Sequence, residues 1–98
     1  MRIIPEIGLK GLAAIEHKEP CDRIYVTPVS WLTIPGSQKR FIIEHELAHC
    51  EHGVYDEIEA DTIAYQNFVR RGGNPQTAIS TLEDNMNHLH PANRQRIK

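Results

Sequence analysis

Three residues in the middle of the chain have the types and the spacing of a metal-dependent catalytic site. They are His45, Glu46 and His49, which form an H-E-x-x-H pattern. On a helix that turns by about 100° per residue, the two histidines lie about 40° apart and one turn apart, so both imidazoles can bind one ion. Glu46 lies about 60° from His49 and can reach a water molecule on that ion without binding the metal itself.

The pattern matches the chemistry of metal-assisted hydrolysis. Neutral imidazoles are common ligands of Zn²⁺, and zinc lowers the pKa of the water that it binds to about 7. The Glu46 carboxylate accepts a proton as the hydroxide attacks a carbonyl carbon, and later delivers that proton to the leaving amine. The pattern therefore predicts His45 and His49 as metal ligands and Glu46 as the general base.

A zinc peptidase needs a third protein ligand, and the residues after the motif offer four candidates: His52, Glu57, Glu59 and Asp61. His52 lies about 10 Å along the helix from His45, which is far for one shared ion. Glu59 points about 160° away from Glu57 around the next predicted helix. Glu57 and Asp61 share one helix face, so helical geometry leaves both open as the ligand. Asp61 could instead hydrogen-bond a ligand imidazole.

The segments that must position these residues are predicted to be helical. The apolar periodicity predicts helices over 38–52, 57–71 and 75–87, with a short further helix starting at His90-Pro91. Ser37, Asp56 and Asn74 are the expected N-caps, and Pro75 suits a first helical position. Glycines follow the first two helices, at Gly53 and at 72–73, and are expected to end them.

The N-terminal third is predicted to add a small sheet. Arg23–Thr27 is rich in β-forming residues, and Pro28 after it suggests an edge strand. Residues 6–17 have apolar spacings that favour a helix but contain two glycines, and a first strand at 2–4 is equally compatible. Residues 29–34 are interpreted as a connector or a second extended stretch. The expected fold class is α+β, with a small sheet whose edge strand packs on the H-E-x-x-H helix and two or three further helices.

Composition excludes several classes of function. The 98 residues are enough for one small domain, residues 1–98, and 40% hydrophobic with 24% charged residues suits a globular chain. Eleven Lys and Arg against thirteen Asp and Glu give a net charge of −2, which leaves no basic excess for nucleic-acid binding. No apolar run approaches the roughly 20 residues of a membrane span. We therefore expect neither a nucleic-acid nor a membrane partner.

The two cysteines, Cys21 and Cys50, are too few to predict a disulfide scaffold. They are interpreted as reduced thiols, with Cys50 a small buried side chain beside the motif. The N-terminus has no apolar run of the kind found in signal peptides. These features together predict a cytoplasmic protein.

The segment from Glu57 to Pro75 resembles the second signature of gluzincin metallopeptidases, and is most similar to HtpX and the CAAX prenyl proteases. The shared features are an E-x-x-x-D pattern at Glu57 and Asp61 and a Gly-Asn-Pro turn into the next helix. The resemblance implies a minimal zincin-like domain in which Glu57 is the third zinc ligand and Asp61 orients a ligand histidine. The ImmA/IrrE family, with H-E-x-x-H and a Glu three residues before an Ala, also selects Glu57. Only seven residues separate His49 from Glu57, far fewer than in the HtpX-type enzymes.

The end of the chain adds a second point of resemblance. Residues 90–97 match the H-P-x-x-x-x-R-I segment of HtpX-type catalytic domains, where the His and Arg approach the catalytic centre. The resemblance implies that His90 and Arg96 support the oxyanion. By residue type alone, His90 is also an ordinary residue at a helix start and Arg96 an ordinary solvated charge. Tyr55, in the turn beside the motif, could donate to an oxyanion or simply pack.

The leading hypothesis is a soluble zinc metalloendopeptidase whose protein or peptide substrate pairs with the edge strand 23–27 by β-augmentation. The main alternative is a non-catalytic, zinc-stabilised protein-binding module, because a chain this small gains much stability from a structural metal. A regulatory peptidase of the ImmA/IrrE kind differs only in its substrate. Glu46 separates enzyme from binder, since a structural site fills four ligand positions and needs no base.

Overall fold

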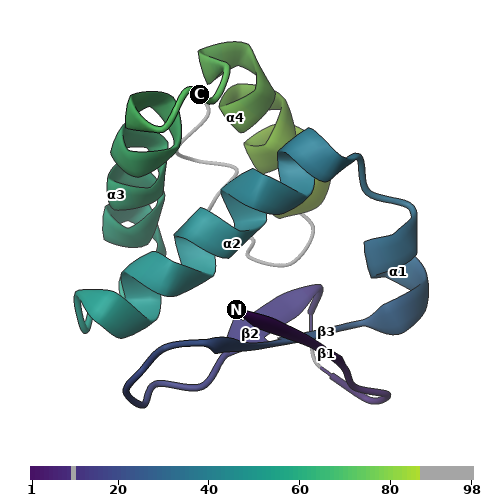
Figure 1. Cartoon of the computed structure of the whole chain (residues 1–98). Coiled ribbons are helices and arrows are strands. Elements are labelled where there is room, and N and C mark those ends of the chain that lie inside the picture. Colours follow the sequence, from purple (N-terminus) through teal and green to yellow (C-terminus); the bar gives the residue numbers. More distant parts are fainter. Residues whose placement is uncertain (10, 87–98) are drawn as a thin grey trace.

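A three-stranded mixed sheet forms one side of the molecule (Figure 1). The computed structural model describes residues 1–9 and 11–86. The strands are β1 (Arg2–Pro5), β2 (Ala13–Ile15) and β3 (Arg23–Val26), in the order β1-β3-β2. The central strand β3 runs parallel to β1 and antiparallel to β2. Both β1 and β2 are therefore edge strands.

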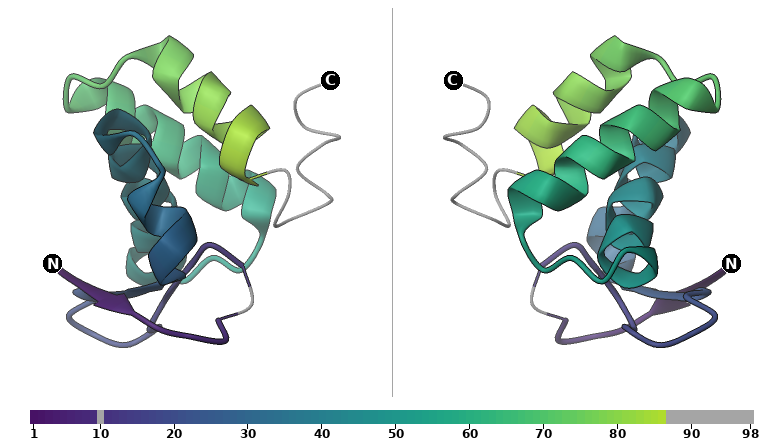
Figure 2. Two further views of the ribbon diagram at one scale, coloured as in Figure 1. Left: turned by 90° about the vertical axis from the view of Figure 1, so that its right-hand side faces the viewer. Right: turned by 90° about the vertical axis from the view of Figure 1, so that its left-hand side faces the viewer.

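The helices follow the sheet in the chain, and α2 packs on it. They are α1 (Pro28–Leu32), α2 (Gly36–Glu51), α3 (Glu57–Arg70) and α4 (Pro75–Thr81), and α4 continues as a π-helical turn over Leu82–Met86. The sheet lies along one side of α2, and α3 and α4 lie on the other (Figures 1 and 2). This arrangement confirms the expected α+β class, with a small sheet packed on the helix that carries the motif.

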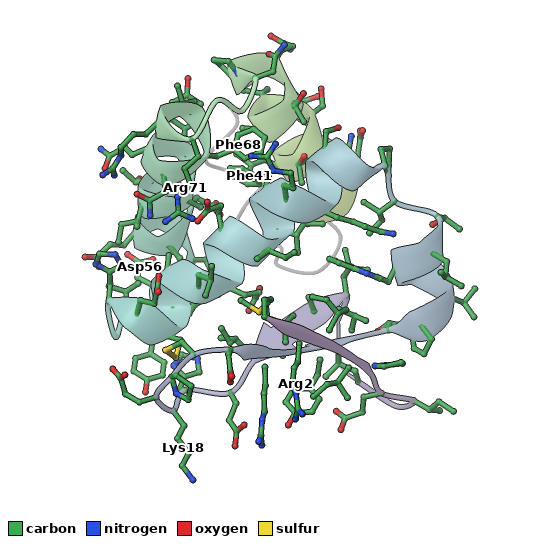
Figure 3. All side chains as sticks on the ribbon, in the orientation of Figure 1. Arg2, Lys18, Phe41, Asp56, Phe68 and Arg71 are labelled. Carbon is green, nitrogen blue, oxygen red and sulfur yellow. A yellow bond between two sulfur atoms is a disulfide. The ribbon has the colours of Figure 1, made fainter. Side chains whose placement is uncertain are left out.

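Helix α2 is buried from both sides, and this holds its functional residues in place. Ile42 packs into a core shared with the sheet, which includes Ile24, Val26 and Trp31. Phe41, one residue earlier, joins a second core with residues of α3 and α4 (Phe68, Ala64 and Ala78). The Phe41 and Phe68 rings meet edge to face with centroids 5.5 Å apart (Figure 3). Adjacent side chains of α2 thus anchor the helix in two different layers.

Two of the three predicted helix caps are confirmed. The Asp56 side chain accepts a hydrogen bond from the Ile58 amide at the start of α3, and Asn74 accepts one from the Gln76 amide at the start of α4. Ser37 is not a cap, because α2 begins one residue before it and Pro35 occupies the cap position without a side-chain hydrogen bond. The short helix predicted from His90 lies outside the described residues.

The N-terminal predictions were wrong at three points. The strand over 23–26 is central and not at an edge, because Pro28 lies beyond its end, in the first turn of α1. Of the two interpretations of residues 29–34, a connector or an extended stretch, the extended one is wrong, because 29–32 are helical and belong to α1. Residues 6–17 form no helix, because Gly8 and Gly11 have φ of 88° and 100° and turn the chain back from β1 into β2.

The two cysteines form a disulfide, which corrects the prediction of reduced thiols. Cys21, just before β3, is bonded to Cys50 near the end of α2, with Cα atoms 5.9 Å apart. That separation lies within the normal range for disulfides. The bond lies near the labelled Lys18, beneath the C-terminal end of α2 (Figure 3). It joins the sheet layer to the helix that carries the motif.

Among the described residues, no helix is both long enough and apolar enough to cross a membrane.

We predict that breaking the disulfide lowers the free energy of unfolding by about 3 kcal/mol. The two cysteines are 29 residues apart in the sequence, and closing a loop of that length restricts the unfolded chain by roughly this amount. Chemical denaturation of the protein with and without a reductant measures the change. The double variant Cys21→Ala/Cys50→Ala is the control and should not respond to the reductant. Identical curves for oxidised and reduced wild type would contradict the prediction.

Candidate metal centre

The second half of α2 carries the three motif residues into the interior. His45 is fully buried, and Glu46 and His49 are 6% and 7% exposed. The histidines lie one helical turn apart, and their rings meet edge to face with centroids 4.7 Å apart. They are buried because α2 is covered by the sheet on one side and by α3 on the other. Removing three polar side chains from water at one place is therefore unfavourable in free energy by itself.

The tight connection between α2 and α3 brings Glu57 to the two histidines. Helix α2 ends at Glu51, with His52 as its C-cap, and α3 begins at Glu57 itself, directly after the Asp56 cap (Figure 3). One Glu57 oxygen lies 3.1 Å from Nε2 of His45, and the other lies 3.0 Å from Nε2 of His49. The two Nε2 atoms are themselves 3.1 Å apart. The two imidazole nitrogens and the carboxylate thus lie at the corners of a triangle, with one ligand atom from each within 4.8 Å of the others.

The opposite nitrogen of each imidazole has its own partner, and this decides which way the lone pairs face. Nδ1 of His45 lies 2.6 Å from Oδ1 of the buried Asp61, and Nδ1 of His49 lies 2.7 Å from the Val54 carbonyl oxygen. Both partners are acceptors, so each Nδ1 carries the donated hydrogen. The lone pairs of the two Nε2 atoms therefore point toward Glu57.

The triangle fits a metal ion. Two imidazole nitrogens and a carboxylate face one another, so their common space suits either a cation or protons on the imidazoles. Two protons would place two positively charged rings against each other with Nε2 atoms 3.1 Å apart. A single divalent cation satisfies all three atoms at once. The group His45, His49 and Glu57 can therefore hold a metal ion.

The structure separates the roles of the two competing carboxylates. Glu57 is grouped with the histidines, whereas Asp61, one turn further along α3, lies behind His45 and contacts its other nitrogen. His52 and Glu59, the remaining candidates, are exposed and outside the group. His90 and Arg96, which the resemblance assigned to the oxyanion, lie outside the described residues.

Glu46 lies beside the triangle and not in it. Its nearest oxygen is 3.9 Å from Nε2 of His45, too far for direct hydrogen bonding. Burial raises the pKa of Glu46 to about 7, against the lowering effect of His45 and His49, and the nearby Glu57 charge adds to the rise. A carboxylate with a pKa near neutrality can both take and return a proton at physiological pH.

The pKa of His49 is set by opposing influences. Burial would lower it, but the hydrogen bonds that the protonated ring makes with Glu57 and with the Val54 carbonyl more than offset this effect, so the pKa is raised. The charge on Glu57 thus favours a cation at the site.

An open groove runs along the site and gives it access to solvent. It is lined by the edge strand β2, by the motif helix and by two connecting segments (Ala13, Ala14, Ile15, His17, Glu46, His49, Tyr55 and Glu57). Sequence reasoning missed the part played by β2 and by His17. His17 belongs to no motif, and only the pairing of β2 with β3 brings it to the site.

No protein-family model matches this chain, and no curated protein and no solved structure matches it significantly.

We predict that the protein binds about one Zn²⁺ per chain and melts at a higher temperature when loaded, since the ion binds only the folded arrangement. His45→Ala and His49→Ala should abolish binding, and Glu57→Gln should weaken it strongly. Asp61→Asn should weaken it by about 10- to 100-fold, the usual cost of losing a group that orients a ligand. Titration calorimetry and metal analysis measure these effects.

The matched control is Glu59→Gln, which changes an exposed carboxylate two residues from Glu57 and should bind zinc like wild type. A larger loss for Asp61→Asn than for Glu57→Gln would reverse the two assigned roles.

Proposed function

We propose that this chain is a zinc-dependent hydrolase that cleaves peptide bonds. The observation that carries the proposal is the position of Glu46, a buried carboxylate beside three ligand atoms that it does not join. A structural zinc is normally enclosed by four protein ligands, whereas a catalytic zinc has three and an open position. The described residues supply three, and the group borders an open groove.

Zinc suits the ligand set better than the other common cations of proteins. Two imidazoles and one carboxylate are ligands typical of catalytic zinc sites, while magnesium and calcium prefer oxygen ligands alone. Bond lengths of 2.0–2.1 Å in a tetrahedral site place neighbouring ligand atoms about 3.3 Å apart. The two Nε2 atoms here are 3.1 Å apart, and each lies 3.0 to 3.1 Å from one of the two Glu57 oxygens, so the nitrogens require only a small expansion.

The residues of the chain divide the work of hydrolysis among them. When bound, zinc polarises the substrate carbonyl and makes the attacking water more acidic. Glu46 takes the proton of that water and returns it to the departing amine. Asp61 and the Val54 carbonyl hold the two imidazoles in the orientation that keeps their Nε2 atoms available. Burial of this assembly keeps bulk water from competing with its hydrogen bonds.

An extended peptide is the substrate that best fits the groove. The expected pairing strand, 23–27, is central and already paired on both sides, so it cannot accept a substrate. β2 takes its place as the strand beside the site, because it lies at the sheet edge and its residues Ala13, Ala14 and Ile15 line the groove. Backbone hydrogen bonds to β2 would present a substrate carbonyl to the zinc without requiring a particular side chain.

The disulfide bears on where such an enzyme works. A buried cysteine paired across two layers of a small domain is typical of proteins in oxidising compartments. It favours a non-reducing environment over the cytoplasm that the composition suggested.

The alternative of a zinc-stabilised binding module keeps one supporting observation. His49 lies in α2 and Glu57 begins α3, so an ion bound between them would cross-link the two helices. Both functions require the metal. Only the enzyme requires Glu46.

We predict that Glu46→Gln leaves zinc content and melting temperature near those of wild type but lowers hydrolysis by about 10²- to 10⁴-fold, because the amide cannot carry the proton. Release of fragments from unfolded casein and from a mixed peptide library measures the activity. Glu59→Gln is the matched control and should cleave like wild type. Equal cleavage by Glu46→Gln and wild type would contradict the mechanism. Zinc binding without cleavage of either substrate by wild type would favour the binding module.

A further inference from the structure

Two exposed rings from distant parts of the chain stack on each other at the mouth of the groove. His17 lies between β2 and β3, and Tyr55 lies between α2 and α3. Their rings are nearly parallel, at 5°, with centroids 5.0 Å apart. The His17 ring also contacts that of His49, at 6.1 Å between centroids. His17 is therefore placed between a solvent-facing tyrosine and a histidine of the metal group.

The segment that carries His17 is tied to the motif helix by a covalent bond. Cys21 follows His17 by four residues and is bonded to Cys50, which directly follows His49. Two backbone hydrogen bonds close the segment on itself and on β3: from the Cys21 amide to the Lys18 carbonyl, and from the Glu16 amide to the Arg23 carbonyl. The position of His17 relative to His49 is thus set by the disulfide and by the sheet.

The groove holds few side chains that can donate a hydrogen bond. The ring nitrogens of His49 are engaged by the Val54 carbonyl and by the metal triangle. Glu46 and Glu57 act as acceptors, and the three β2 residues that line the groove offer only backbone groups. Of the described residues that line it, His17 and Tyr55 alone supply side-chain donors beyond the triangle. Of these two, His17 has a ring contact with His49, and Tyr55 stacks on His17.

We propose that His17 is a catalytic residue that donates a hydrogen bond from its imidazole to the carbonyl oxygen of the scissile peptide bond, and that Tyr55 is a positioning residue stacked behind it. The proposal rests on the hydrolytic function proposed above. As the water oxygen bonds to the carbonyl carbon, the π electron pair moves onto the carbonyl oxygen, and a donor aimed at that oxygen stabilises the charge. Glu46 holds the proton of the water meanwhile. The carbon–nitrogen bond then breaks, the oxygen reforms its double bond, and the amine leaves with that proton.

The test uses binding as well as turnover. Acetohydroxamate is a small probe whose carbonyl oxygen and hydroxamate oxygen can occupy the open side of the metal. Its affinity is read from the visible absorption of the full-length protein loaded with Co²⁺ in place of zinc. His17→Ala should weaken acetohydroxamate binding by about 10- to 100-fold, the usual effect of removing one donor from a charged oxygen. His17→Gln, which restores an N–H donor, should recover part of the loss.

Tyr55 supplies the matched pair of variants. Tyr55→Phe keeps the stacked ring and should bind acetohydroxamate like wild type, whereas Tyr55→Ala removes the ring and should show a loss smaller than that of His17→Ala. The affinity for Co²⁺ should be unchanged in all four variants, because neither residue is a ligand. With a cleavable peptide, His17→Ala should lower kcat with little change in KM.

Four outcomes would overturn the assignment. The first two concern His17→Ala: unchanged acetohydroxamate binding, or a loss of Co²⁺ affinity, which would make His17 a ligand. The third is a loss of acetohydroxamate affinity in Tyr55→Phe as large as that in His17→Ala, which would make the hydroxyl the donor. The fourth is a loss of acetohydroxamate affinity in His90→Ala or Arg96→Ala with none in His17→Ala. A wild type that binds no Co²⁺ overturns this proposal and the hydrolase together. His17-dependent probe binding without any cleavage supports the oxygen-binding role and contradicts only the peptidase.

Discussion

Two imidazole nitrogens and a carboxylate that face one another at about 3 Å where α2 meets α3 are the constraint on which the rest of the structure depends. Such a cluster favours a cation or protons at its centre, because lone pairs and a negative charge that face one another repel unless a positive charge lies between them. The surrounding contacts keep it together. Asp61 and the Val54 carbonyl fix the rings from behind, and the two cores fix α2.

The helical half of the fold and the metal group were largely predictable, because their signals are local. On any α-helix, the spacing of His45 and His49 places the two side chains on the same face, one turn apart. The Asp56 cap marks the start of α3 and thereby places Glu57. Helical geometry could not show which carboxylate binds the metal, Glu57 or Asp61, because both lie on one face of the helix. Only the path of the connection between α2 and α3 shows that Glu57 reaches the Nε2 atoms and Asp61 the opposite nitrogen.

The structure of the N-terminal half could not be predicted in the same way, because it depends on pairings between residues that are distant in the sequence. Pro28 indicates that a strand ends but cannot show which strands lie on either side of it. The bond between Cys21 and Cys50 joins positions that only the folded sheet brings within reach. His17 was missed for the same reason. Its position beside the motif follows from the antiparallel pairing of β2 with β3, and no residue near it in the sequence signals that pairing.

The connection between α2 and α3 has a consequence for the order of folding. The most distant members of the metal group, His45 and Glu57, are 12 residues apart in the chain, whereas β1 and β3 pair across 21 residues. The entropy lost on closing a loop grows with its length, and local contacts form before distant ones. By this measure the α2–α3 hairpin and the β2–β3 hairpin, whose strands pair across 9 to 13 residues, are the segments best suited to form first, and an ion captured by the helical hairpin would be held before β1 has joined the sheet. The groove would then be assembled where the two hairpins meet.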